Sequence, residues 1–360
     1  MRRLALIAGL ILPLLATGPL RGDETGLSEP EIRAAIDRSL PLLIQGARGS
    51  REQRRQCFTC HGEGAAIRAL AAARSRGIPI DEEEFRANVR FVADFLARNQ
   101  AGYLEGRGQG GRALTAGYAL WALEEGEEPS SATTGAVAEY LLRYQKDRNH
   151  WEPDMPRPPS EKSFFTASYV ALRGLKTYGT PDQRERILAR TGEVGTWVRS
   201  APAEETEDHV FRLWSLEAIG AGESELSRTA EGLMALRRED GGWAQRPDLE
   251  SDVYSTGTAL VSLRRAAGMP PDDPVYRAGL RFLIRTQLED GSWHVVTRSE
   301  PIMTYFESGY PHGADQFLSM AAAGWATTAL ILAIPESPLD LVPPPPPLPV
   351  RDSKTAASLP

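Results

Sequence analysis

The heptapeptide QLEDGSW, residues 287–293, decides the fold of this chain. It follows a stretch in which apolar residues recur at helical spacing, from Tyr276 to Ile284. The Asp-Gly pair ends that helix, because glycine adopts a left-handed turn without steric cost. Trp293 can then stack across the helix end and contact the next element. The heptapeptide therefore predicts a helix with a fixed end and a tryptophan that ties it to its neighbour.

The same motif occurs earlier in the chain. RREDGGW occupies residues 237–243 and QKDRNHW occupies residues 145–151, each with a tryptophan six positions after the first polar residue. The motif recurs at a period of about 45 to 50 residues, which is typical of helical repeat arrays.

A second kind of segment alternates with these motifs. Its members are nearly all apolar and rich in small residues, as helices buried on both sides are. They are residues 65–73, 115–123, 166–175, 209–219, 255–263 and 322–330. Buried helices alternating with amphipathic ones predict an all-α chain of helical hairpins, and strands have almost no support.

This pattern resembles the squalene–hopene cyclase and protein prenyltransferase superfamily, whose QxxDGxW repeats decorate an α/α toroid. The resemblance covers roughly residues 30–334 and is most specific at QLEDGSW. It implies a barrel of inner helices inside a ring of outer helices, with a cavity at one end. The chain also resembles exported bacterial proteins that combine such repeats with one C-x-x-C-H motif.

The catalytic residues of that superfamily do not carry over. Class II terpene cyclases protonate an alkene with the middle acid of Asp-x-Asp-Asp, held protonated over an apolar cavity. The nearest local match is ESDVYSTG, residues 250–257, where Tyr254 and Ser255 replace the two later acids. There is no Asp-Asp-x-x-Asp either, and Tyr254 replaces the cysteine of the prenyltransferase zinc site. These departures argue against terpene cyclase activity.

Two polar clusters at the starts of inner helices are candidates for the rim of the cavity. They are Glu250, Asp252 and Tyr254, and His312, Asp315 and Gln316. Such residues cap helix N-termini, and they also serve as ligand contacts. Both interpretations stay open from sequence. The ligand interpretation predicts an enzyme or binder for an isoprenoid or other apolar molecule.

The motif with the most specific chemistry is C-F-T-C-H, residues 57–61, which matches the attachment pattern of c-type haem. Cysteines three apart on a helical turn face the same way, so both thiols can add to the haem vinyl groups. His61 would then bind the iron. We therefore expect one covalent haem c, held by Cys57, Cys60 and His61, for electron transfer or haem-based redox binding with a redox partner protein.

Other uses of the same residues stay open. Cys57 and Cys60 could form a disulfide in an oxidising compartment, bind zinc together with His61 and a fourth ligand, or hold no cofactor. If haem is bound, its distal ligand must come from elsewhere in the chain. The candidates are His209, His312, Met303 and Met320.

The two ends read as segments outside the fold. Arg2 and Arg3 precede an apolar run that is too short to span a bilayer, so residues 1–22 are predicted to be a signal peptide. This predicts a periplasmic or secreted protein. Residues 335–360 contain VPPPPPLPV and are predicted to be a disordered polyproline tail. The toroid domain is then expected over residues 23–334.

Composition excludes further classes. The 360 residues are 41% hydrophobic with a formal charge of −7, and no block of basic residues is present. This argues against nucleic acid as a partner. No later segment is long and apolar enough for a membrane helix. A pure interaction scaffold, without cofactor or apolar ligand, is the third functional hypothesis.

Overall fold

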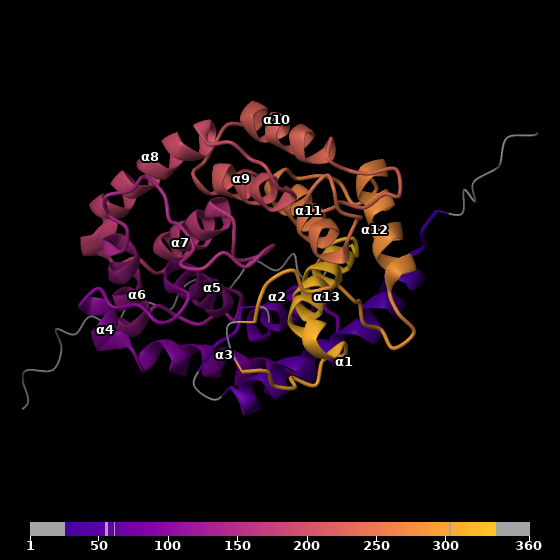
Figure 1. The fold of residues 1–360 in the computed structure, drawn as a ribbon, viewed down its shortest axis with the longest axis horizontal. Helices are drawn as coiled ribbons and strands as arrows, with labels where there is room; N and C mark the ends of the chain where they lie inside the picture. Colours follow the sequence, from indigo (N-terminus) through magenta and orange to yellow (C-terminus); the bar gives the residue numbers. More distant parts are fainter. Residues whose placement is uncertain (1–25, 55–56, 61, 302–303, 336–360) are drawn as a thin grey trace, which may run out of the picture.

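The small, apolar segments of the sequence form an inner barrel of helices. The computed structural model describes residues 26–54, 57–60, 62–301 and 304–335. The inner helices are α2 (Glu63–Ser75), α5 (Arg112–Glu125), α7 (Phe164–Tyr178), α9 (Thr206–Ala218), α11 (Val253–Ala266) and α13 (Gln316–Ile331). Each packs on the next, and α13 packs back on α2, so the barrel is closed (Figure 1).

Small residues allow these helices to approach closely. A Cβ added to Gly257 of α11 would lie 2.8 Å from the backbone nitrogen of Ala326 in α13. A Cβ on Gly324 would likewise lie 2.8 Å from Ala65 of α2. Real Cβ atoms do not tolerate such distances, so glycine at these positions sets how tightly the barrel can close.

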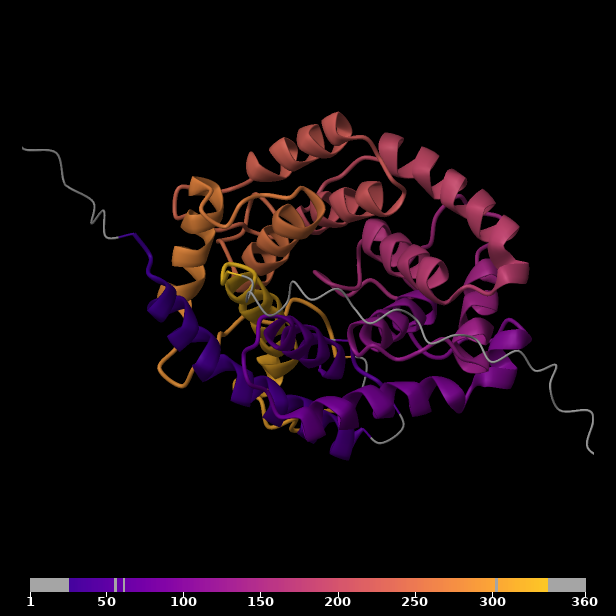
Figure 2. The same cartoon turned by 180° about the vertical axis from the view of Figure 1, so that it is seen from behind.

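The amphipathic segments form an outer ring around the barrel (Figures 1 and 2). The outer helices are α1 (Glu29–Gln53), α3 (Glu82–Ala97), α6 (Ala132–Arg143), α8 (Arg184–Ser200), α10 (Glu223–Met234) and α12 (Pro274–Thr286). Short helices lie in the connections: α4 (Gln100–Leu104), η1 (Pro181–Gln183) and η2 (Gly313–Asp315). Among the described residues there is no strand, only two isolated bridges. The chain is therefore an α/α toroid.

The motif tryptophans cap the outer helices. The indole N–H of Trp151, Trp243 and Trp293 donates to the carbonyl ten residues earlier, at 3.1, 2.8 and 2.8 Å. Those carbonyls lie in the last turns of α6, α10 and α12, where a helix has no partner of its own for them. All three tryptophans are fully buried. The left-handed conformation predicted for the glycine is found at Gly241 and Gly291, with φ of 89° and 88°. The prediction that the Asp-Gly pair ends the helix is wrong, because α10 ends at Met234 and α12 at Thr286, and the Asp-Gly pairs lie in the turns that follow.

The same tryptophans also bind the barrel. The backbone N–H of Trp243 donates to the hydroxyl of Thr256 in α11 at 2.9 Å, and that of Trp151 donates to Ser168 in α7 at 3.1 Å. Trp151 and Trp243 therefore each join the end of an outer helix to the inner helix that follows it, whereas the backbone N–H of Trp293 donates to Tyr310 in the connection before α13.

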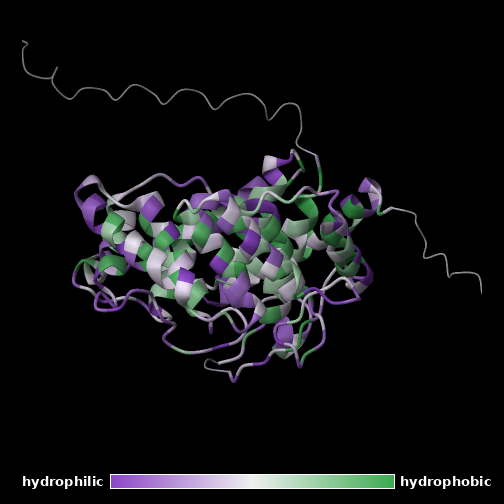
Figure 3. Ribbon diagram, turned by 90° about the horizontal axis from the view of Figure 1, so that it is seen from above, coloured by the Kyte–Doolittle hydropathy of each residue, from purple (hydrophilic) through white to green (hydrophobic). Residues whose placement is uncertain are grey.

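The connections divide the toroid into two faces. Links from an inner to an outer helix are short, whereas most links from an outer to the next inner helix are long, for example residues 144–163, 235–252 and 287–315. Seen edge-on, the long connections gather on one side of the disc (Figure 3). The N-termini of the inner helices lie at this face. Within the described part of the chain, no helix is both long and apolar enough to cross a bilayer.

Several predictions concern residues that the structure does not describe. The predicted signal peptide, residues 336–360 of the predicted tail, His61 and Met303 all lie outside the described residues.

Candidate functional site in the inner barrel

An aromatic cluster lines the inside of the barrel. The ring centroid of Trp121 in α5 lies 5.5 Å from Tyr169, 5.6 Å from Trp214 and 5.9 Å from Trp325. These four side chains come from four different inner helices. Their ring faces carry partial negative charge, so the cluster favours apolar and cationic groups.

A cation of the chain itself occupies this cluster. The Arg68 guanidinium lies 3.9 Å from the ring centroid of Trp325 and 4.6 Å from that of Trp121. Arg68 is only 4% exposed, and its Nε has no hydrogen-bond acceptor. Burial lowers the pKa of Arg68 from its ordinary value. Arginine is unusual in a helix as apolar as α2, and that contrast was visible in the sequence.

A small cavity lies in front of Arg68, at the face of the long connections. Its volume is about 10 Å³, which is room for one water molecule. Its lining includes Cys60, Arg68, Tyr118, Ser160, Tyr254 and Trp325. Tyr254 is the predicted rim residue that the structure brings to this cavity.

A buried carboxyl group adjoins the cavity wall. Glu207, the second residue of α9, is 3% exposed. Its Oε1 accepts hydrogen bonds from the hydroxyl of Thr166 at 3.0 Å and from that of Tyr254 at 3.2 Å. Its Oε2 is buried and has no partner. Burial raises the pKa of Glu207 to about 8, so this carboxyl group is protonated at neutral pH.

The arrangement of these oxygens locates the proton. Because Oε1 accepts two hydrogen bonds, the proton of the neutral acid belongs on Oε2. That O–H has no acceptor among the described residues. Glu207 is therefore a buried acid whose O–H donates no hydrogen bond to a described residue.

Glu207 also has a sequence signal that the search for aspartates missed. Residues 205–208 read E-T-E-D at the start of an inner helix. This places acids at the three positions of Asp-x-Asp-Asp, with Glu207 in the middle. Residues 250–257 have an acid, Asp252, at only the first of these positions, so residues 205–208 are the better match.

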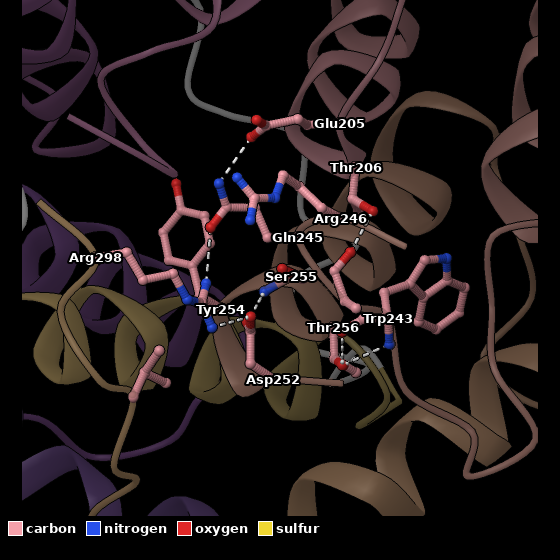
Figure 4. A network of polar contacts seen from close by, with 12 residues as sticks. Glu205, Thr206, Trp243, Gln245, Arg246, Asp252, Tyr254, Ser255, Thr256 and Arg298 are labelled. Carbon is pink, nitrogen blue, oxygen red and sulfur yellow. Dashed lines mark hydrogen bonds and ion pairs between the residues drawn. The ribbon is translucent and has the colours of Figure 1, made fainter. Parts of the chain in front are cut away.

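A polar network closes the same end of the barrel (Figure 4). Arg298 donates to Gln245 and to Asp252, both at 2.8 Å, and Gln245 donates to Glu205 at 2.7 Å. Glu205 also pairs with Lys162. The network thereby joins the connections before α7, α9, α11 and α13 over the cavity.

Most of the other predicted rim residues hold loops rather than line the cavity. Asp252 accepts a hydrogen bond from the Ser255 backbone at 2.7 Å and caps α11. Gln316 is fully buried, and its amide oxygen accepts from the Ser308 backbone at 2.7 Å. Glu250 is exposed and lies outside the cavity lining.

His312 and Asp315 of the second predicted cluster form a separate group near the surface with His294, apart from the buried Gln316. Asp315 accepts from His294 and from the Thr297 backbone, both at 2.8 Å. His312 lies 2.9 Å from the Ser292 hydroxyl, and its ring stacks on His294 at 4.7 Å. Burial and the neighbouring His294 lower the pKa of His312. Tyr254 and this cluster are therefore not parts of one site.

The two cysteines lie in the connection between α1 and α2, not on the helical turn that the sequence suggested. No disulfide joins them. Cys60 donates to Glu161 Oε1 at 3.4 Å, and Glu161 also pairs with Arg157. Burial, followed by the negative charge of Glu161, raises the pKa of the Cys60 thiol.

This environment does not fit a haem as it stands. Attachment needs two cysteines that are not joined in a disulfide, a condition that is met, and space for the macrocycle beside them. The cavity at Cys60 holds about 10 Å³. Among the described residues, no three His, Cys, Asp or Glu side chains are arranged to hold a metal ion, and His61 lies outside them.

The described candidates for a distal ligand lie in packing environments of their own. Met320 is 1% exposed, and its sulfur packs against Gly46 of α1, outside the barrel. His209 is half-buried at the start of α9, where burial and the charge of Arg212 lower its pKa. Neither residue lines the cavity at Cys60.

Comparison with solved structures identifies the architecture. Type II terpene cyclase MstE from Scytonema superposes with a TM-score of 0.52 at 12% identity, over 85% of this chain and 98% of that one. The fold is that of a terpene cyclase-like α/α toroid. A protein from Actinoplanes (TM-score 0.54, 16% identity, 84% and 99% covered) has the same fold. So does a possible member of the GH105 family from Salmonella enterica (TM-score 0.50, 11% identity, 89% and 99% covered).

A sequence relative points the same way. Drimenyl diphosphate synthase from Streptomyces showdoensis is 29% identical over 199 residues, which cover 51% of this chain and 36% of that protein. The chain thus matches only about a third of the length of that curated relative. No protein-family model matches the chain.

Proposed function

We propose that this chain binds an isoprenoid, or a similar apolar ligand, inside the inner barrel and presents the protonated Glu207 to it. The observation that carries the proposal is the buried O–H of Glu207, which has no acceptor and stands beside an aromatic interior. MstE, of the same fold, has been solved in complex with geranylgeranyl dihydroxybenzoate as its substrate. That ligand is an isoprenoid, which supports the class of ligand proposed here.

The aromatic rings and the acid have different roles in this proposal. The rings of Trp121, Trp214 and Trp325 supply apolar surface and stabilise positive charge. The Glu207 O–H donates a hydrogen bond, or its proton, to the ligand. If the proton leaves, the hydroxyls of Thr166 and Tyr254 already donate to the carboxylate that remains.

Ligand entry requires the barrel end to open, because the cavity is about 10 Å³ as described. The Arg298 network crosses this end and belongs to connections rather than helices. Connections of this kind open at lower free energy than packed helices do. The proposal therefore places the ligand's path between the connections that Arg298 joins.

The experiment titrates the protein with farnesol, geranylgeraniol and squalene and follows tryptophan fluorescence. We expect saturable binding of at least one probe. Ser160→Phe should weaken it about tenfold or more, because the added ring enters the cavity from its wall. Ser200→Phe, at an exposed position of α8, is the matched control. Absence of saturable binding, or equal binding by both variants, would contradict the proposal.

We propose covalent haem attachment in an exported protein as a second function. It is favoured by the C-x-x-C-H pattern and by the absence of a disulfide between Cys57 and Cys60, which lie in a connection at the face of the long connections. Attachment would require Cys60 to leave Glu161. The haem would supply one-electron chemistry to a redox partner protein.

Co-expression with a cytochrome c maturation system tests this second proposal. A haem-bearing protein should be red and should keep its haem mass after denaturation. Replacing Cys57 and Cys60 together should remove the colour while the helical circular dichroism stays, because the repeats supply the core. A colourless product with the mass of the bare chain would refute it.

A further inference from the structure

Arg68 is a buried cation for which the protein provides no anion. It is 4% exposed, makes no ion pair with any described residue, and its Nε has no acceptor. The contacts with Trp121 and Trp325 stabilise the charge from two sides but accept no hydrogen bonds from the edge of the guanidinium. A charge buried in this way is costly unless a partner of opposite sign accompanies it.

The acidic side chains near Arg68 either pair with other arginines or are protonated. Glu125 accepts from Trp121 Nε1 at 2.9 Å and pairs with Arg265 at 3.2 Å and Arg173 at 3.5 Å. Glu161 pairs with Arg157. Glu207 is protonated at neutral pH and therefore carries no charge to offer. None of these acids makes an ion pair with Arg68, and the Glu125 charge that acts on it is shared with two other arginines.

The space in front of Arg68 has an apolar lining with several polar groups that can donate hydrogen bonds. The guanidinium shares the cavity lining with the side chains of Tyr118, Ser160 and Tyr254. The Tyr254 hydroxyl donates to Glu207, whereas that of Tyr118 makes no hydrogen bond with a described residue. A buried guanidinium and an uncommitted hydroxyl at one small cavity suit an anion and reject a cation.

We propose that Arg68 and Tyr118 form an anion subsite inside the barrel. The cavity of about 10 Å³ accepts a single-atom anion such as chloride as it stands. The same chemistry suits the carboxylate head of an acidic isoprenoid. This second source rests on the proposed function, whereas the subsite itself does not.

The free-ion arm uses the full chain in chloride-free buffer. Bromide is titrated against gluconate at equal ionic strength, and tryptophan fluorescence and the melting temperature are followed. We expect saturable quenching, because Trp121 and Trp325 flank Arg68. Arg68→Met should abolish it, and Tyr118→Phe should weaken it about tenfold. Arg281→Met, at an exposed position of α12, should leave it unchanged.

The head-group arm compares farnesoic acid with farnesol. If the subsite takes a head group, the acid binds about tenfold or more tightly than the alcohol, and Arg68→Met removes that preference. Arg68→Lys keeps the charge and guards against a folding defect in the Met variant. Arg68-dependent binding in either arm supports the subsite.

Two results separate this inference from the proposed function. If neither bromide nor farnesoic acid shows a dependence on Arg68 in folded variants, the anion subsite is overturned, even where farnesol binds. If bromide binds through Arg68 while no isoprenoid binds, the subsite stands and the isoprenoid proposal fails.

Discussion

Replacing Glu207 by Gln is expected to make the protein more stable at neutral and alkaline pH. The ordinary pKa of a glutamate is 4.5, and burial raises that of Glu207 to about 8. As pH rises between these values, the unfolded chain loses its proton while the folded chain keeps it, so wild-type stability falls. The Gln variant does not titrate. Its advantage should approach about 3 kcal/mol at pH 7 and about 5 kcal/mol above pH 8.

Urea unfolding of both proteins between pH 5 and pH 9 measures this difference. Glu63, whose pKa burial raises to about 7, titrates in both proteins and cancels in the comparison. Glu217→Gln, at an exposed position of the same helix, should leave the profile unchanged. A difference between wild type and Glu207→Gln that does not grow with pH would show that Glu207 is ionised in the folded protein.

Replacing Trp243 by Ala should cost about 3–5 kcal/mol of unfolding free energy. The substitution leaves a cavity at a fully buried position. It also removes the N–H donor to Leu233, so the end of α10 loses a cap. The cost should appear as a lower urea midpoint without loss of the helical signal before the transition.

Two variants test the reasons for that cost. Trp243→Phe keeps most of the packing but not the hydrogen bond, so it should cost clearly less than the alanine. Trp197→Ala removes a half-buried indole from the last turn of α8, where its N–H makes no hydrogen bond with a described residue. Equal losses for Trp197→Ala and Trp243→Ala would mean that the capping role of the motif tryptophan is unimportant.

The fold was largely predictable, because its signals are local. The turn that follows α12 contains the left-handed Gly291, and Trp293 reaches back only ten residues to a carbonyl in the last turn of that helix. The small-residue segments become inner helices because only such surfaces pack closely on two sides. These are interactions between residues near in sequence or shared by every repeat.

The site was predictable only in part. Tyr254 was among the predicted rim residues and does line the cavity, but Glu250 next to it is exposed. Glu207 and Arg68 were missed, although E-T-E-D and the arginine inside the apolar segment 65–73 were visible signals. Their importance depends on which side of the helix faces the barrel axis, and this follows from the closure of the ring.

The sequence by itself determined where helices begin and end, which of them are buried, and therefore the toroid. Turn chemistry and apolar periodicity depend on residues that are close together in the sequence, so both can be recognised from the sequence alone. Only the tertiary structure decided the electrostatics of the interior. The closed ring places Arg68 of α2 and Tyr254 of α11 at one small cavity, and Tyr254 contacts Glu207 of α9. There the Glu207 O–H has no acceptor, and Arg68 makes no ion pair, among the described residues. Burial and the distances between charges, which set those properties, exist only once the ring has closed.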